Sequence, residues 1–221
     1  MRRRAQIRRP GPITTGGAGH PGSLGFLACT LVALTLAGCT AAPPLKMYTL
    51  SPSTAGGAEA MTSADPPPPP GAPVIEVTRV RLPTYVDSRD LVVRQGDLLE
   101  RSSTGRWASR LSIAATDLLT ARLALRWPDA WVTDQAQARP PDYRLMVDIS
   151  RLDITNTGKG TLEADWAIVP RNASARVVRE RTQFTMSGQV GTDESVAGFV
   201  RKLLERLSSE IDLSSLHSPG G

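Results

Sequence analysis

Between residues 143 and 190 apolar and polar side chains alternate, and no other feature of the sequence constrains the fold as strongly. Every odd-numbered residue is apolar over 143–149, and every even-numbered one is apolar over 162–168. A period of two is typical of strands that bury one face and expose the other. Residues 156–160 between these stretches are rich in turn formers. We therefore expect three consecutive antiparallel strands, the third over residues 178–190.

Two other stretches repeat apolar residues at intervals of three and four, which is the period of an amphipathic helix. The first covers residues 107–125 and is followed by Pro128, a residue that helices rarely continue through. The second begins near Thr192, and the two acidic residues that follow suit the positive end of the helix dipole. Its apolar stripe runs over residues 196–211.

Two stretches upstream of the first helix, residues 74–82 and 85–94, are rich in β-forming side chains and are expected to be extended. The chain thus reads as strands, helix, strands, helix. This order predicts an α+β fold in which an antiparallel sheet carries two amphipathic helices packed on one face.

The N-terminus has the pattern of an export signal. Residues 1–9 carry five arginines, and residues 24–36 form an apolar run of 13 residues. A run of this length is too short for a stable membrane-spanning helix, which needs roughly 20 residues. The sequence Leu-Ala-Gly then precedes Cys39 and resembles the lipobox of bacterial lipoproteins. We expect residues 1–38 to be a signal peptide that is cleaved before Cys39.

Cys39 is therefore the expected site of lipidation, since its thiol can carry a diacylglycerol. Several acyl chains anchor a protein stably, because each buried methylene contributes about 0.8 kcal/mol. The only other cysteine, Cys29, lacks the motif. The residue after the lipidated position is Thr40 rather than an aspartate, and this resembles lipoproteins that are forwarded to the outer membrane in enteric-type bacteria. The expected location is the cell envelope, lipid-anchored at the outer membrane and facing the periplasm.

The charge of the mature chain argues against nucleic-acid binding. The whole chain has a formal charge of +5, with 26 basic and 21 acidic side chains. Residues 1–38 contribute five arginines and no acidic residue, so the remainder is neutral. A neutral surface without a basic run gains little from displacing counterions from a phosphate backbone.

The residue types that most often carry chemistry are scarce in the mature chain. It has no cysteine beyond Cys39, and of two histidines His20 leaves with the signal while His217 lies in a Ser/Pro/Gly tail. We therefore expect no disulfide, no metal site, no cofactor and no catalytic triad, and do not expect an enzyme. Asp87 and Asp90 are read as a solvated charged loop rather than as paired catalytic carboxylates.

The mature chain divides by composition. Residues 39–73 hold the lipidated N-terminus, a short strand expected within residues 45–50, and a proline run at residues 66–70 that favours polyproline II. Residues 74–213 are expected to form one domain. Residues 214–221 are expected to be a disordered tail.

Three short sequences allow comparison with a known family. Residues 46–50 read KMYTL, residues 82–92 read LPTYVDSRDLV, and residues 106–108 read RWA. In this order they resemble segments of the ABC-type transport auxiliary lipoproteins, a family that includes paraquat-inducible protein C. The resemblance extends over roughly residues 45–212. The order within residues 88–90 and the length of the proline-rich loop differ from the family pattern.

The resemblance implies an accessory role in lipid transport between membranes. Proteins of this family work with an inner-membrane ATPase, a permease, and a periplasmic protein that contains an MCE (mammalian cell entry) domain. We expect this chain to dock the MCE protein at the outer membrane, and a homo-oligomeric ring of several copies is one form that this docking could take. The alternative is a stand-alone envelope binding or assembly lipoprotein without an ATP-driven partner, and the sequence does not separate the two. Polar residues interrupt the segment at 82–91, which gives a candidate partner interface formed by Leu82, Pro83, Tyr85, Asp87, Arg89 and Leu91.

Overall fold

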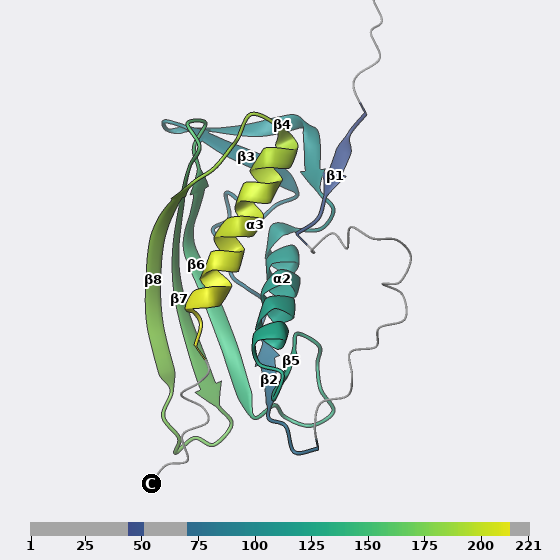
Figure 1. Ribbon diagram of the computed structural model, residues 1–221, viewed down its shortest axis with the longest axis vertical. Coiled ribbons are helices and arrows are strands. Elements are labelled where there is room, and N and C mark those ends of the chain that lie inside the picture. Colours follow the sequence, from purple (N-terminus) through teal and green to yellow (C-terminus); the bar gives the residue numbers. More distant parts are fainter. Residues whose placement is uncertain (1–43, 51–69, 213–221) are drawn as a thin grey trace, which may run out of the picture. The chain divides into compact units, whose positions relative to one another are not determined.

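The computed structural model describes residues 44–50 and 70–212, which form two sheets and two helices (Figure 1). The signal peptide, Cys39 and the other predictions for residues 1–43, 51–69 and 213–221 lie outside the described residues. The elements in chain order are β1 (Lys46–Tyr48), β2 (Val74–Val77), β3 (Asp90–Gln95), β4 (Leu98–Trp107), α2 (Leu111–Arg126), β5 (Trp131–Thr133), β6 (Tyr143–Ile154), β7 (Lys159–Pro170), β8 (Val178–Ser187) and α3 (Asp193–Glu210). The α+β class is confirmed, and both helices lie on the same side of the larger sheet.

The larger sheet has five strands in the order β5-β2-β6-β7-β8. β6, β7 and β8 are antiparallel neighbours, which confirms the three strands expected from the alternation. The β6–β7 turn contains Gly158, whose φ of 82° lies in the left-handed region that glycine adopts without strain.

The prediction of a purely antiparallel sheet is wrong, because β2 pairs in parallel with both β5 and β6. A parallel neighbour requires a long crossover connection. Between β2 and β5 the chain passes through the smaller sheet and α2, which together provide that crossover. The larger sheet is therefore mixed.

The smaller sheet has three strands in the order β1-β4-β3, with β1 parallel and β3 antiparallel to β4. The sequence did not indicate β4, because most of its residues are polar or exposed. Two expectations nearby are also wrong. Residues 85–89 form turns rather than a strand, and the first helix begins at Leu111 rather than at Trp107. Trp107 is the last residue of β4, and its side chain is buried. It precedes the buried Leu111 by four residues, which is a helical spacing, and this explains the wrong prediction.

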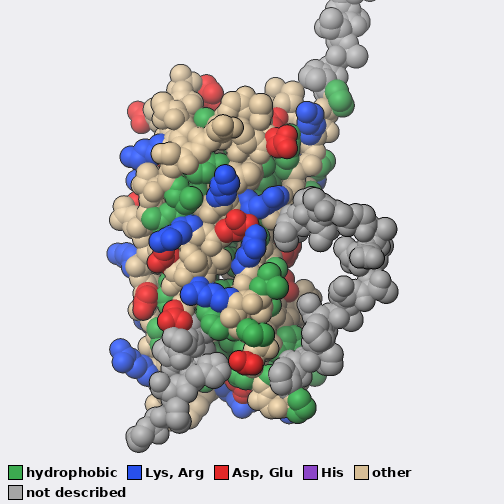
Figure 2. All heavy atoms as spheres, viewed as in Figure 1, with side chains coloured by type: hydrophobic (Ala, Val, Ile, Leu, Met, Phe, Trp, Pro, Cys, Tyr) green, Lys and Arg blue, Asp and Glu red, His purple; other side chains and the backbone are tan. Residues whose placement is uncertain are grey.

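The start of α3 is confirmed at the position that the sequence predicted. Thr192 caps the helix: its hydroxyl accepts a hydrogen bond from the backbone N–H of Ser195 at 3.2 Å. The Ser195 hydroxyl in turn accepts one from the Thr192 N–H at 3.0 Å. An ion pair between Arg122 on α2 and Glu205 on α3 joins the two helices. On the face seen in Figure 1, basic and acidic side chains are intermixed (Figure 2).

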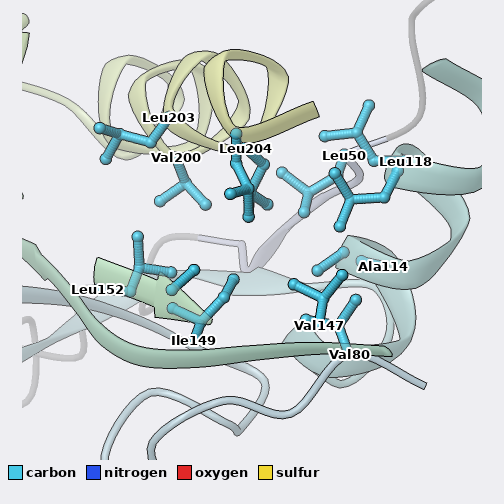
Figure 3. Packing of buried hydrophobic residues seen from close by; sticks show 14 of the residues in the cluster. Leu50, Val80, Ala114, Leu118, Val147, Ile149, Leu152, Val200, Leu203 and Leu204 are labelled. Carbon is cyan, nitrogen blue, oxygen red and sulfur yellow. The ribbon is translucent and has the colours of Figure 1, made fainter. Parts of the chain in front are cut away.

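One hydrophobic core lies between the helices and the larger sheet (Figure 3). Leu203 and Leu204 of α3, Leu118 of α2 and Ile149 of β6 are each at most 1% exposed. Leu50, which follows β1, is equally buried and ties that strand to the same core. Within the described residues, no helix is both long enough and apolar enough to span a bilayer.

Helix α3 approaches β7 and β8 closely because glycines face it. A Cβ atom added at Gly160 of β7 would lie 2.7 Å from Cζ of Phe199, and one at Gly188 would lie 2.6 Å from Cδ2 of the same ring. Phe199 is 2% exposed. Any larger side chain at either glycine would therefore push the helix away from the sheet.

A buried carboxylate joins the two sheets. Asp153 of β6, 7% exposed, accepts hydrogen bonds from Nε of Arg94 on β3 at 3.0 Å and from Nε of Arg151 at 2.8 Å. Burial of the carboxyl raises its pKa, but the hydrogen bonds from Arg151 and Arg94 outweigh that effect, and the pKa of Asp153 lies below its ordinary value of 3.8. The ionised carboxylate of Asp153 therefore stabilises the folded state.

We expect Asp153→Asn to lower the free energy of unfolding at pH 7 by about 2 kcal/mol, because it leaves the Arg94 guanidinium without its charged partner and leaves Arg151 with Glu163 alone. Since the pKa is lowered on folding, the contribution of Asp153 is present above pH 3.8 and is lost as the pH falls below that value. The difference between the two proteins should therefore shrink in acid. Urea unfolding of both proteins at pH 7 and near pH 3 measures this difference in free energy of unfolding. Asp165→Asn is the control, because the exposed Asp165–Arg181 pair should matter little. A constant difference across this pH range would contradict the assignment.

Candidate partner-binding site

The segment predicted to contact partners, residues 82–91, forms a turn and the start of β3. The backbone N–H of Asp87 donates to the carbonyl of Pro83 at 3.0 Å. The Asp87 carboxylate accepts a hydrogen bond from the backbone N–H of Ser112 at 3.1 Å and pairs with Arg110 at 3.3 Å. It thus satisfies a free N–H in the first turn of α2, the role of a capping side chain.

Three other residues of the segment also make contacts within the fold. Leu91 is 2% exposed and belongs to the core. The Tyr85 hydroxyl accepts from the backbone N–H of Leu152 at 3.4 Å, and burial raises the pKa of this hydroxyl. Arg89 is exposed, and its Nε donates to the carbonyl of Trp107 at 3.2 Å.

The predicted residues thus lie along one stretch, but several are held by the fold. Leu82 and Pro83 are half-buried, and Leu82 packs against the core. Among the six residues, only Arg89 is exposed. Contact between this segment and a partner stays a prediction.

The face of the larger sheet opposite the helices offers a second candidate surface that sequence reasoning missed. The strand register places Met146 of β6, Ala167 of β7 and Arg179 of β8 in one row across this face. Met146 is 48% exposed, although its outward position would ordinarily hold a polar residue. Val169 follows Ala167 on the same face, so the centre of the surface is apolar.

The neighbouring row is charged. Asp148 of β6 and Asp165 of β7 stand directly opposite each other, an arrangement that is unfavourable for two like charges. Arginines on both sides offset it: Arg81 lies 3.4 Å from Asp148, and Arg181 lies 2.7 Å from Asp165. The hydrogen bond from Arg181 lowers the pKa of Asp165. The row therefore reads positive, negative, negative, positive from one side of the sheet to the other.

These two rows line a groove with a volume of about 760 Å³. Met146, Ala167 and Val169 contribute to its lining, and the arginines at positions 81 and 181 stand on its two sides. Arg179 also lines it and forms no ion pair with any carboxylate of the described residues. An apolar centre with a charged rim is typical of surfaces that bind another molecule. The apolar centre of the groove has room for an apolar side chain of another molecule. The Arg179 guanidinium could pair with a carboxylate of that molecule.

The sequence contains two irregularities at this groove. On β6 the outward positions Arg144 and Asp148 are charged, and Met146 between them breaks the alternation. On β7 the outward positions change from charged to apolar after Asp165. Without the register of the two strands, nothing shows that these two irregularities lie side by side.

In the part of the chain that the structure describes, no three His, Cys, Asp or Glu side chains gather in a way that would hold a metal ion. The arrangement that the groove presents is suited to binding. Its charged groups are paired with each other or exposed at the rim.

Comparison with known proteins places the chain in context. The family model described as "ABC-type transport auxiliary lipoprotein component" matches residues 48–212. A crystal structure of an uncharacterized protein is 15% identical with a TM-score of 0.58, covering 76% of this chain and 95% of that one. A Xanthomonas campestris protein is 18% identical with a TM-score of 0.49, covering 65% of this chain and 85% of that one. No curated protein matches the sequence. At these identities the first structure supports the fold alone.

Proposed function

The chain belongs to the family of ABC-type transport auxiliary lipoproteins, and from this membership we propose that it docks an MCE protein at the outer membrane as the non-catalytic, lipid-anchored part of a lipid transport system. The family match carries the proposal, since it covers nearly all of the described residues. The family itself implies the coarser part of this role, that of an envelope-associated lipoprotein that assists an ABC transport system. The MCE protein, the permease and the ATPase as partners, and the outer membrane as the site, belong to the proposal.

The anchor is proposed from the sequence around Cys39. The Leu-Ala-Gly-Cys motif and the basic and apolar regions before it support acylation of this residue. Six residues separate Cys39 from β1, and in any conformation they span at most roughly 20 Å. An acylated Cys39 would thus hold the domain close to the bilayer.

The groove on the outer face of the larger sheet is the proposed docking site for the MCE protein. Its apolar centre at Met146 and Ala167 would take an apolar side chain of the partner. The Arg179 guanidinium would pair with a partner carboxylate, because no carboxylate of the described residues neutralises it. The helices cover the opposite face of this sheet, so neither of the described helices lies on the outer face.

The test is a pull-down of the tagged lipoprotein from envelopes in mild detergent. The unmodified protein should recover an MCE protein. Met146→Lys should reduce that recovery about tenfold, the effect of about 1.4 kcal/mol of lost binding energy. The new lysine faces solvent near Asp148 and Asp165, so the fold should tolerate it. Leu125→Lys, at a leucine that is 77% exposed on α2, is the matched control and should leave recovery unchanged.

Two further results bear on the proposal. Arg179→Glu should weaken recovery as Met146→Lys does, because it reverses the charge at the rim. Arg89→Glu tests the segment predicted from the sequence in the same assay. Repeated absence of an MCE protein from the pull-down of the unmodified protein would refute the docking role, whatever the variants do.

A further inference from the structure

Strand β1 presents two large apolar side chains to solvent. Leu45, just before the strand, is 54% exposed, and Met47 within it is 47% exposed. Because side chains alternate along extended chain, these two residues share a face. The other face carries Lys46 and Tyr48, which line a hollow of about 570 Å³ beside the start of α3. The exposed apolar face is therefore the one turned away from the domain.

The residues that follow this apolar face are bonded to the rest of the domain. The backbone N–H of Ala108 donates to the carbonyl of Tyr48 at 2.8 Å. The Arg201 guanidinium donates to the carbonyl of Thr49 at 2.9 Å. Leu50, 1% exposed, anchors the end of the segment in the core. Met47 itself pairs with Arg106 of β4, so the strand that carries it is bonded to the domain.

The short stretch of chain between this face and Cys39 indicates which surface the face contacts. Leu45 lies six residues after Cys39, and residues this close along the chain are within roughly 20 Å of each other. Among the exposed large apolar residues of the described chain, Leu45 and Met47 are the nearest in sequence to Cys39. If Cys39 carries acyl chains in a bilayer, they therefore lie close to that bilayer. Leu98, the first residue of β4, is 59% exposed. β3 and β4 lie in the upper part of Figure 1, as β1 does.

We propose that β1 lies against the membrane surface, with Leu45 and Met47 inserted at the boundary between headgroups and acyl chains. The inference rests on the lipid anchor of the proposed function. Apolar side chains at this depth gain from leaving water. Lys46 starts on the opposite face of the strand, but its side chain is exposed and long enough for the ammonium to extend toward anionic headgroups beside β1. The contact sets the orientation of the domain: the end with β5 and the last turn of α2 points away from the bilayer.

A fluorescence experiment on the full-length, lipidated protein tests this orientation. In the processed protein Cys29 is gone and the Cys39 thiol is acylated, so an introduced cysteine is the one free thiol. Met47→Cys and the matched control Leu125→Cys are labelled with the same polarity-sensitive fluorophore. Both proteins are reconstituted in vesicles of phosphatidylethanolamine and phosphatidylglycerol, with and without a lipid that carries a quencher on its acyl chain.

We expect the label at position 47 to emit as in an apolar environment and to be quenched several-fold more by the lipid-borne quencher than the label at position 125. Equal quenching at both positions would overturn the inference. So would an apolar emission at position 47 without quenching, because a second copy or another part of the chain would then cover β1. Protein that does not float with the vesicles would refute the anchor, and the proposed function with it, whereas floating protein with an unquenched label refutes the β1 contact alone.

Discussion

Replacing Cys39 with serine is expected to abolish the incorporation of labelled palmitate into the protein. The membrane fraction should then contain no lipid-anchored form of the protein. The serine hydroxyl cannot form the thioether that carries the diacylglycerol. Each methylene of an acyl chain contributes about 0.8 kcal/mol to membrane binding, so loss of all the chains removes the main attachment of the mature protein. The measurement is palmitate labelling of growing cells, followed by recovery of the tagged protein.

Cys29→Ser is the matched control, because Cys29 lies within the apolar run of the signal and lacks the motif before it. This variant should incorporate palmitate as the unmodified protein does. Mass spectrometry of the native protein offers an independent readout and should find an acylated Cys39 as the first residue. Label retained in Cys39→Ser, or an unmodified N-terminus elsewhere, would contradict the anchor and the proposals that depend on it.

Phe199→Ala is expected to have the largest effect on stability, with a loss of about 3–5 kcal/mol. The ring fills the space left by Gly160 and Gly188, whose missing side chains let α3 approach the sheet. Alanine would leave a cavity that these glycines cannot fill. A domain of this kind has a total stability of about 5–15 kcal/mol, so the variant should unfold at much lower urea concentration.

Phe199→Leu should cost less than Phe199→Ala, because a branched apolar side chain fills part of the same space. Lys202→Ala, at an exposed position of the same helix, should change stability by no more than about 0.5 kcal/mol. Urea unfolding followed by circular dichroism gives all three values. A loss for Phe199→Ala no greater than for Lys202→Ala would show that the ring does not hold the helix against the sheet.

Several elements could be predicted from the sequence because their signals are local. The alternation over residues 143–168 reports a strand pair with one buried face, and the structure contains β6 and β7 there. The capping residue Thr192 and the stripe after it report α3 to within one residue. Strand β4 left no such signal, since its polar, exposed residues have no periodic burial.

The candidate site was harder to predict than the fold. The predicted segment at residues 82–91 contains Asp87, whose polar side chain suggested a surface role but caps α2 in the structure. The groove around Met146 and Ala167 depends on the register of two strands, which brings an outward methionine beside an outward alanine. A single sequence shows each irregularity but not their adjacency.

The sequence by itself determined the α+β class, the antiparallel β6-β7-β8 unit and the motif at Cys39, because period, turn and processing signals are read from neighbouring residues. Only the tertiary structure decided that β2 runs parallel to β5 and β6, that Asp153 joins the two sheets, and that β1 turns Leu45 and Met47 outward. Strand direction, pairing partners and exposure depend on contacts between residues far apart in the chain, and a local pattern carries no information about which distant strand will supply them.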